Sequence, residues 1–204
     1  PYGQASMGYA DDNANIEPGF FGYGNFNDPT YMPYMESHDE QWLMHKNATF
    51  GNANAEGTYD VKDFKTALDR QKLVGAFFFT LPGPRMTWQF AELGYGYEPD
   101  ECLQDDGGAE NCPASAPGRT GEKPIRWEYR DAEQSPDRVR LYKTWQALLR
   151  LRNDNPELFA KEPGIGNPEQ GISMNAQTGD KVRWIKLRDE TLDTVIVGNF
   201  DVIR

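Results

Sequence analysis

The stretch that decides the fold of this chain runs from Val61 to Phe90 and reads VKDFKTALDRQKLVGAFFFTLPGPRMTWQF. Apolar residues recur at i, i+3, i+4 and i+7 through its first twenty residues, which predicts a helix over residues 61–80 with one broad buried face. Asp60 is a suitable N-cap, and Asp63 in the first turn favours the helix dipole. The two prolines and the glycine of LPGP then end the helix. A short strand is expected to follow over residues 85–90.

A second strand is expected before this helix. Residues 30–37 form a short apolar and aromatic segment with Pro33 near its beginning, where a strand tolerates proline. The order strand, loop, helix, turn, strand makes a βαβ unit, whose two strands must be parallel with a right-handed crossover. Residues 1–30 show no periodicity and are expected to form a long surface loop, and residues 47–58 a polar loop.

The chain changes character after a second predicted helix. A long loop is expected over residues 94–124, and a helix over residues 136–153 begins at Ser135 followed by proline. Residues 172–174, 182–188 and 194–197 then read as short antiparallel strands. This pattern predicts a second, β-rich domain that begins near residue 160.

Composition limits the function. The 204 residues carry a formal net charge of −11 and no basic stripe, so a nucleic-acid partner is not expected. No apolar run is long enough for a membrane span. Aromatic residues make up 13% of the chain, which suits a ligand with flat faces but equally suits ordinary packing.

Cys102 and Cys112 lie in one loop rich in glycine and aspartate. A disulfide between them would stabilise the fold by roughly 3 kcal/mol on the chain-entropy model and would indicate an oxidising compartment. Two reduced thiols are the alternative. A metal site is not expected, because the spacing is long for a metal-binding pair and histidine is scarce.

The dipeptide His38-Asp39 is the strongest candidate for a functional site. It lies where the apolar segment gives way to a polar one, as at the C-terminal end of a strand, and it contains one of only two histidines. A carboxylate and an imidazole at this position can face a substrate together. A loop or capping carboxylate and a packing histidine are the alternatives.

Three segments around this dipeptide resemble the α-amylase superfamily, glycoside hydrolase family 13. The segment YMESHDE at residues 34–40 is similar to the family's last signature, at the end of the seventh barrel strand. Residues 79–94 resemble the helix that leads into the eighth strand, and residues 123–127 with 148–153 resemble the approach to the last barrel helix. The resemblance implies an α/β fold. Residues 1–158 would be the C-terminal portion of a TIM (β/α)8 barrel, and residues 159–204 the beginning of an antiparallel β-sandwich domain.

The resemblance also implies roles for individual residues. Asp39 would be the third catalytic carboxylate, which stabilises the oxocarbenium-like transition state, and His38 would hydrogen-bond the same sugar. Glu92 matches an acidic residue after the eighth strand, with a supporting role. Trp88 and Tyr95 are candidates for stacking on sugar rings, although packing explains them equally well. Ser37 departs from the asparagine that is common before His-Asp in the family, so the fine specificity remains open.

The implied activity is hydrolysis of α-1,4-glucosidic bonds in starch-like glucans with retention, and the implied partner is an α-glucan or maltooligosaccharide. In the family the nucleophile and the acid/base precede the segments found in this chain, so we expect a fragment that is inactive alone. A partial barrel also exposes strand edges that favour self-association. No cofactor is expected in this part, although upstream residues could bind calcium. Secretion, or a periplasmic or cell-surface location, is expected. A branching enzyme or transglycosylase, and a non-catalytic glucan-binding barrel protein, are the alternatives.

Overall fold

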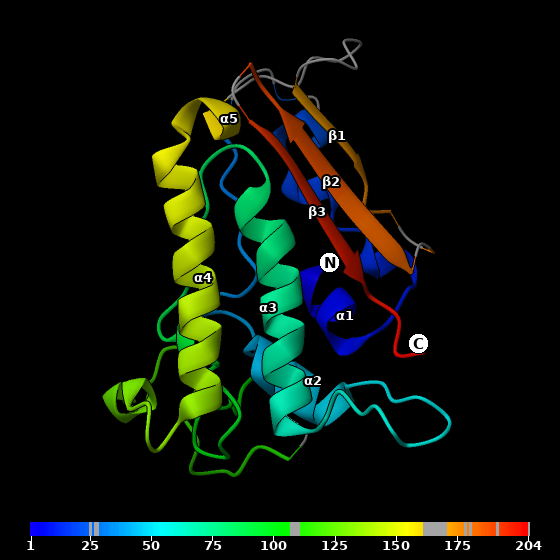
Figure 1. Cartoon of the computed structure of the whole chain (residues 1–204). Helices are drawn as coiled ribbons and strands as arrows, with labels where there is room; N and C mark the ends of the chain where they lie inside the picture. The colour runs from blue at the N-terminus through cyan, green and yellow to red at the C-terminus, as the bar shows by residue number, and fades with distance from the viewer. Residues whose placement is uncertain are drawn as a thin grey trace.

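The computed structural model describes residues 1–24, 26, 29–106, 111–160, 171–177, 179, 181–190 and 192–203. Two long helices, α3 (Phe64–Thr80) and α4 (Pro136–Asp154), lie side by side next to a three-stranded sheet of β1 (Gly171–Asn175), β2 (Val182–Arg188) and β3 (Asp193–Asn199), as Figure 1 shows. Shorter α-helices are α1 (Tyr2–Met7), α2 (Leu43–Phe50) and α5 (Pro156–Ala160). Short 3-10 helices are η1 (Asp12–Ala14), η2 (Glu17–Gly19), η3 (Phe21–Gly24), η4 (Ala91–Leu93) and η5 (Trp127–Arg130).

Both predicted long helices are present, with small shifts at their ends. Helix α3 begins three residues later than expected because Asp63, and not Asp60, is its N-cap: the Asp63 carboxylate accepts a hydrogen bond from the Thr66 N–H at 3.0 Å. Asp60 instead accepts from the Lys62 N–H in the preceding turn, at 2.8 Å. Helix α4 extends one residue beyond the predicted end, to Asp154.

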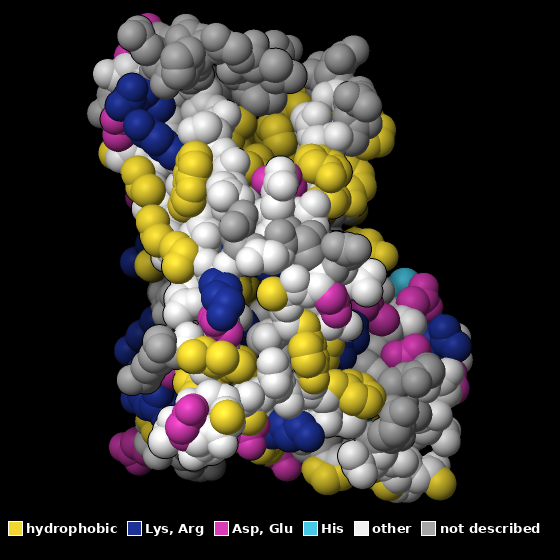
Figure 2. Space-filling view, turned by 90° about the vertical axis from the view of Figure 1, so that its right-hand side faces the viewer, with side chains coloured by type: hydrophobic (Ala, Val, Ile, Leu, Met, Phe, Trp, Pro, Cys, Tyr) yellow, Lys and Arg dark blue, Asp and Glu magenta, His cyan; other side chains and the backbone are white. Residues whose placement is uncertain are grey.

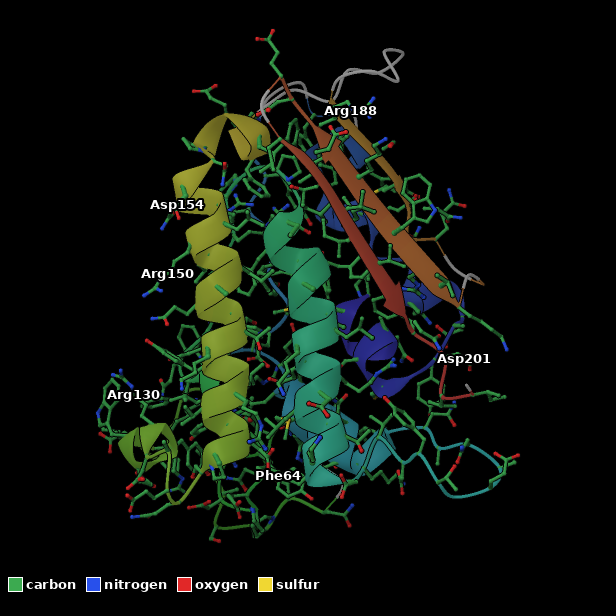
Figure 3. The ribbon with its side chains drawn as sticks, in the orientation of Figure 1. Phe64, Arg130, Arg150, Asp154, Arg188 and Asp201 are labelled. Carbon is green, nitrogen blue, oxygen red and sulfur yellow. A yellow bond between two sulfur atoms is a disulfide. The ribbon has the colours of Figure 1, made fainter. Side chains whose placement is uncertain are left out.

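Helices α3 and α4 approach each other closely at Gly75. A Cβ atom at this position would lie 2.3 Å from Nε1 of Trp145, so only glycine leaves room for the indole. Trp145 is fully buried, packs edge-on against Phe79 with ring centroids 5.1 Å apart, and donates from Nε1 to the Gln71 carbonyl at 3.3 Å. The outward side of α4 is polar, and Figure 3 shows Arg150 and Asp154 pointing away from α3.

The three C-terminal strands are antiparallel, as predicted. Their order is β1-β2-β3, and one face packs on the side of α3 that α4 does not cover. Ile185 and Leu187 of β2 are buried in the same core as α3, and Phe77 packs edge-on against Phe200 with centroids 5.0 Å apart. The sheet therefore shares its core with the helices in the described part of the chain. The domain boundary at residues 158/159 stays a prediction, since residues 161–170 lie outside the described residues.

The two strands expected over residues 30–37 and 85–90 are reduced to one parallel bridge, Tyr34 to Met86. The parallel direction agrees with the predicted βαβ unit, whereas the predicted extent is wrong. Proline explains part of the difference, because Pro33 and Pro84 have no N–H to donate to a ladder. The Met86 N–H donates to the Pro33 carbonyl at 3.2 Å, and these segments have no further strand partner among the described residues.

The N-terminal segment is not the surface loop that its lack of periodicity predicted. It contains α1 and three 3-10 helices, and its buried side chains include Tyr2, Ile16, Phe20 and Phe21. Single turns of helix separated by glycine and asparagine bury aromatic residues without a 3.6-residue period, so the sequence does not predict these helical turns. The polar loop expected over residues 47–58 is also partly helical, because α2 continues to Phe50.

Arg70 ties this N-terminal segment to α3 and to the end of the sheet. Arg70 is 1% exposed, and its guanidinium donates to the carbonyl oxygens of Ala5, Ser6 and Phe200. One side chain of α3 thus satisfies backbone groups from both ends of the described chain.

The surface is mixed in charge. On the face in Figure 2, Lys and Arg side chains are scattered among Asp and Glu, and hydrophobic side chains lie in separate patches. This face carries no continuous basic stripe. None of the helices in the described ranges is long and apolar enough to cross a membrane.

We expect Arg70→Leu to destabilise the protein by at least about 3 kcal/mol, because it removes three buried hydrogen bonds to the carbonyl oxygens of Ala5, Ser6 and Phe200. The free energy of unfolding, measured by urea denaturation, tests this expectation. The matched control is Arg150→Leu on the exposed side of α4, which should change stability by less than about 0.5 kcal/mol. Equal stabilities of the two variants would contradict the role assigned to Arg70.

Candidate functional site

His38 and Asp39 lie in an exposed turn four and five residues after Tyr34, the residue of the parallel bridge. Their side chains are 56% and 69% exposed, and His38 Nε2 lies 3.3 Å from Asp39 Oδ2. The Asp39 N–H donates to the Ser37 hydroxyl at 3.3 Å, which shapes the turn. The imidazole and the carboxylate therefore point to solvent together, where both can reach a ligand.

Trp88 approaches the same turn from the other side of the parallel bridge. It follows Met86 by two residues, and its ring centroid is 5.5 Å from that of His38. Two segments more than forty residues apart thus present an imidazole, a carboxylate and an indole at one place. The sequence placed His38 and Asp39 at the end of the first segment and Trp88 within the second, and the parallel bridge brings these two segments together.

A hollow of about 530 Å³ lies beside Trp88. Its lining residues are Thr87, Trp88, Gln89, Phe90, Glu92, Ile125 and Trp127. Glu92 belongs to η4, and burial raises the pKa of its carboxyl above the ordinary value. Phe90 has a positive φ of 56°, a conformation that non-glycine residues rarely adopt and that often occurs at functional sites.

Tyr95 does not fit the stacking role suggested by the sequence. It is fully buried, and its hydroxyl donates to the Pro124 carbonyl at 2.9 Å. Its ring packs against Trp42 and Phe90, with centroids 4.8 and 5.9 Å away. A sugar ring cannot reach it in this structure, so the contribution of Tyr95 to the site is its packing against Phe90, which lines the hollow.

Trp127 is the exposed aromatic residue that sequence reasoning missed as a site residue. Its side chain lines the hollow, is 64% exposed and meets Phe90 edge-on at 5.0 Å. It lies almost forty residues after Trp88, in a stretch without regular periodicity. The available signal was a tryptophan in a polar, proline-containing segment, where burial does not explain an aromatic side chain.

Glu36 anchors the chain just before the His-Asp turn. Its side chain is buried, and Oε2 accepts a hydrogen bond from the Leu43 N–H at 2.7 Å, at the first turn of α2. Burial raises the pKa of this carboxyl from 4.5 to about 7, against the opposing effect of the Leu43 hydrogen bond. Glu36 therefore couples the turn to α2.

The loop with the cysteines anchors the chain just after the turn. Gln41 exchanges two hydrogen bonds with Leu103: its Nε2 donates to the Leu103 carbonyl at 2.6 Å, and its Oε1 accepts from the Leu103 N–H at 2.9 Å. The Gln41 N–H donates to Asp106 Oδ2 at 2.9 Å. A disulfide joins Cys102 to Cys112 in this loop.

Buried Glu101 holds the same loop to η5. Its carboxylate accepts hydrogen bonds from the Gly96 N–H at 2.8 Å, from Arg126 Nε at 2.9 Å and from the Tyr129 hydroxyl at 2.6 Å. Its carbonyl accepts from Trp42 Nε1 at 2.9 Å. The carboxylate thus bonds the segment of Trp127, while the main-chain carbonyl of the same residue bonds Trp42, which follows the His-Asp turn.

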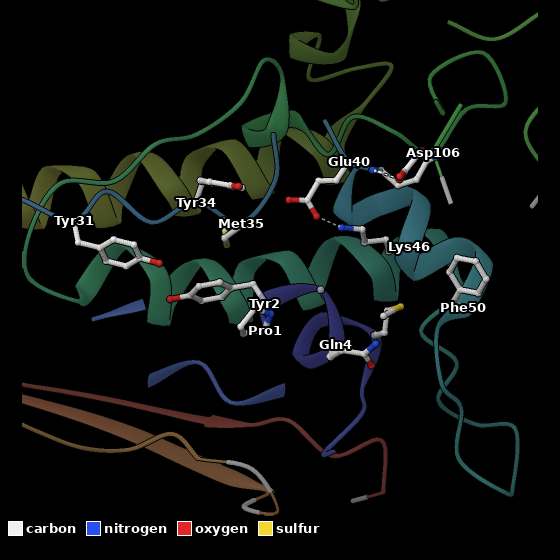
Figure 4. Close-up of a pocket in the computed structure, with 13 residues that line it drawn as sticks. Pro1, Tyr2, Gln4, Tyr31, Tyr34, Met35, Glu40, Lys46, Phe50 and Asp106 are labelled. Atoms are coloured by element: carbon white, nitrogen blue, oxygen red, sulfur yellow. Dashed lines mark hydrogen bonds and ion pairs between the residues drawn. The ribbon is translucent and has the colours of Figure 1, made fainter. Parts of the chain in front are cut away.

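A second hollow of about 540 Å³ lies between α1 and the segment of Tyr34 (Figure 4). Figure 4 shows Tyr2, Tyr31 and Tyr34 at one end and the Glu40–Lys46 ion pair at the other. The Glu40 carboxylate is thus paired with the Lys46 ammonium group. No group of three or more potential metal ligands comes together within the described residues.

Comparisons with known proteins identify a fold. No family model and no curated protein matches the chain. It is similar to a solved structure of an α-amylase from H. orenii, with a TM-score of 0.55 and 17% sequence identity; the match covers 98% of this chain and 36% of the amylase. It is similar to apo pullulanase from Klebsiella pneumoniae with the same TM-score of 0.55 and 17% identity, over 98% of this chain and 25% of the pullulanase. It is also similar to the Klebsiella pneumoniae pullulanase complexed with maltotriose, with a TM-score of 0.54 and 18% identity, over 98% of this chain and 22% of that chain. The chain thus spans about a third or less of these structures, and at these identities the likeness shows a shared fold over part of each enzyme.

The raised pKa of Glu36 predicts a pH dependence of stability. The folded state holds the Glu36 proton up to about pH 7, whereas the unfolded state releases it near pH 4.5, so this group lowers stability as pH rises between these values. Glu36→Gln keeps an oxygen acceptor for Leu43 but cannot ionise. We expect the free energy of unfolding of this variant, minus that of the unmutated protein, to be about 2 kcal/mol larger at pH 8 than at pH 5. Urea denaturation at both pH values measures this change.

Glu133→Gln is the control, because Glu133 is exposed and precedes α4 outside the site. Its stability relative to the unmutated protein should be the same at pH 5 and pH 8. If the stability difference between Glu36→Gln and the unmutated protein were the same at pH 5 and pH 8, as expected for the control, the pKa of Glu36 would not be raised in the folded state.

Proposed function

We propose that this chain is part of an α-amylase-like glycoside hydrolase, in which Asp39 and His38 face the sugar at the cleavage point. The observation that carries the proposal is the exposed His38–Asp39 pair beside Trp88, at the ends of two parallel-bridged segments. The fold shared with parts of an α-amylase and a pullulanase supports it.

The chemistry of glycosidic cleavage suits this pair. Breaking the bond develops positive charge on the sugar ring, and a fixed carboxylate beside the ring lowers the energy of that charge. Among the described residues, His38 is the one basic side chain that forms an ion pair with Asp39. His38 supplies a ring nitrogen for hydrogen bonding to a sugar hydroxyl. Hydrogen bonds of this kind that tighten in the transition state accelerate cleavage.

A retaining reaction also needs a nucleophile and an acid/base about 5 to 5.5 Å apart. The acidic neighbours of Asp39 are unsuited to these roles: Glu36 is buried against the first turn of α2, and Glu40 pairs with Lys46. We therefore assign both roles to residues of a longer protein that precede this chain. In that protein, residues 1–158 would complete the barrel and residues 159–204 would begin the β-domain.

The proposed substrate is an α-1,4-glucan or maltooligosaccharide. One similar structure, a pullulanase, was solved with maltotriose, which supports a glucan as ligand. Calcium, if the longer protein binds it, would be held by upstream residues. The disulfide between Cys102 and Cys112 supports an extracytoplasmic location, because disulfides persist in oxidising compartments.

Asp39→Asn in the longer protein should lower turnover of maltooligosaccharides by roughly 10²-fold or more, because the amide removes the negative charge that faces the developing cation. Thermal stability should change little, since the Asp39 side chain is 69% exposed. Release of reducing ends gives the rate, and product analysis separates hydrolysis from transfer to longer or branched glucans.

Asp154→Asn, on the exposed side of α4 in Figure 3, is the matched control and should leave the rate unchanged. Near-normal turnover by Asp39→Asn would remove Asp39 from catalysis. A longer protein that binds glucans without cleaving them would favour the non-catalytic alternative.

A further inference from the structure

We propose that the hollow between Trp88 and Trp127 binds a glucose ring of the glucan next to the one held by His38 and Asp39, and that Trp127 is its stacking platform. This inference deepens the proposed function and rests on it for the identity of the sugar. Trp127 thereby becomes a substrate-binding residue, in addition to those expected from the sequence.

The hollow adjoins the candidate site through Trp88. This residue lines the hollow, and its ring centroid lies 5.5 Å from that of His38, so neighbouring rings of one glucan could occupy both places. Its volume of about 530 Å³ lies within the usual range of small-ligand sites.

The walls of the hollow combine apolar faces with polar groups. Trp127 and Ile125 are 64% and 66% exposed, an unusual exposure for large apolar side chains that lie together. Thr87, Gln89 and Glu92 add a hydroxyl, an amide and a carboxylate to the same lining. A sugar ring has the matching character, since its C–H faces stack on aromatic rings while its hydroxyls donate and accept hydrogen bonds at its edge.

Trp127 is also held in place before any ligand binds. Its indole packs edge-on against Phe90 at 5.0 Å, and it begins η5. Residues on both sides of it, Arg126 and Tyr129, bond to buried Glu101. A pre-ordered platform loses little conformational entropy on binding, which favours affinity.

Binding of maltotriose to the purified 204-residue protein, measured by isothermal titration calorimetry, tests the inference. Trp127→Ala should weaken binding about tenfold or more, which corresponds to at least about 1.4 kcal/mol. Trp127→Phe should retain most of the affinity because it keeps an aromatic face. Trp184→Ala is the matched control: Trp184 lies on β2 on the face opposite buried Ile185, and its loss should leave maltotriose binding unchanged.

Two results would overturn the inference: no binding of maltotriose to the unmutated protein, or equal affinities of Trp127→Ala and the unmutated protein. Circular dichroism of each variant verifies folding. Asp39→Asn turnover in the longer protein decides the proposed function separately. Loss of turnover with unchanged Trp127→Ala affinity would reject the hollow alone, and weakened Trp127→Ala binding with normal Asp39→Asn turnover would reject the catalytic role alone.

Discussion

The close contact between α3 and α4 at Gly75 is the constraint on which the rest of the structure depends. Since Gly75 has no side chain, the indole of Trp145 lies directly against the α3 backbone, and the two longest helices form one unit. Helix α3 then uses its other sides for the sheet, through Phe77, and for the N-terminal segment and the end of β3, through Arg70. A helix that is buried on several sides in this way determines where every neighbouring segment lies.

The candidate site depends on this helix indirectly, because the segments that carry it have little regular structure of their own. A single parallel bridge joins them, so their side chains are positioned mainly by contacts outside any sheet. Glu36 binds α2 before the turn, and Gln41 binds Leu103 after it. Glu101 then connects that loop to η5. The His-Asp turn is exposed while both flanks are buried, an arrangement that orients a site without covering it.

Long periodic elements were predictable because burial of one face leaves a regular trace in the sequence. The helices α3 and α4 and the three antiparallel strands were located to within a few residues. The N-terminal segment was not, since its single helical turns bury Phe20 and Phe21 without a repeat. Trp127 was missed as a site residue for a related reason: nothing local distinguishes an exposed aromatic residue beside a hollow from one that packs inside.

The sequence by itself determined the order of the two long helices and the three C-terminal strands, the parallel relation of the segments before and after α3, and the chemical character of His38 and Asp39. Local propensity and periodicity carry this information, because they act between residues that are near each other along the chain. The tertiary structure alone decided that Tyr95 is buried while Trp88 and Trp127 share a hollow next to that pair. Such choices follow from contacts between segments far apart in sequence, whose geometry only the packed core around α3 specifies.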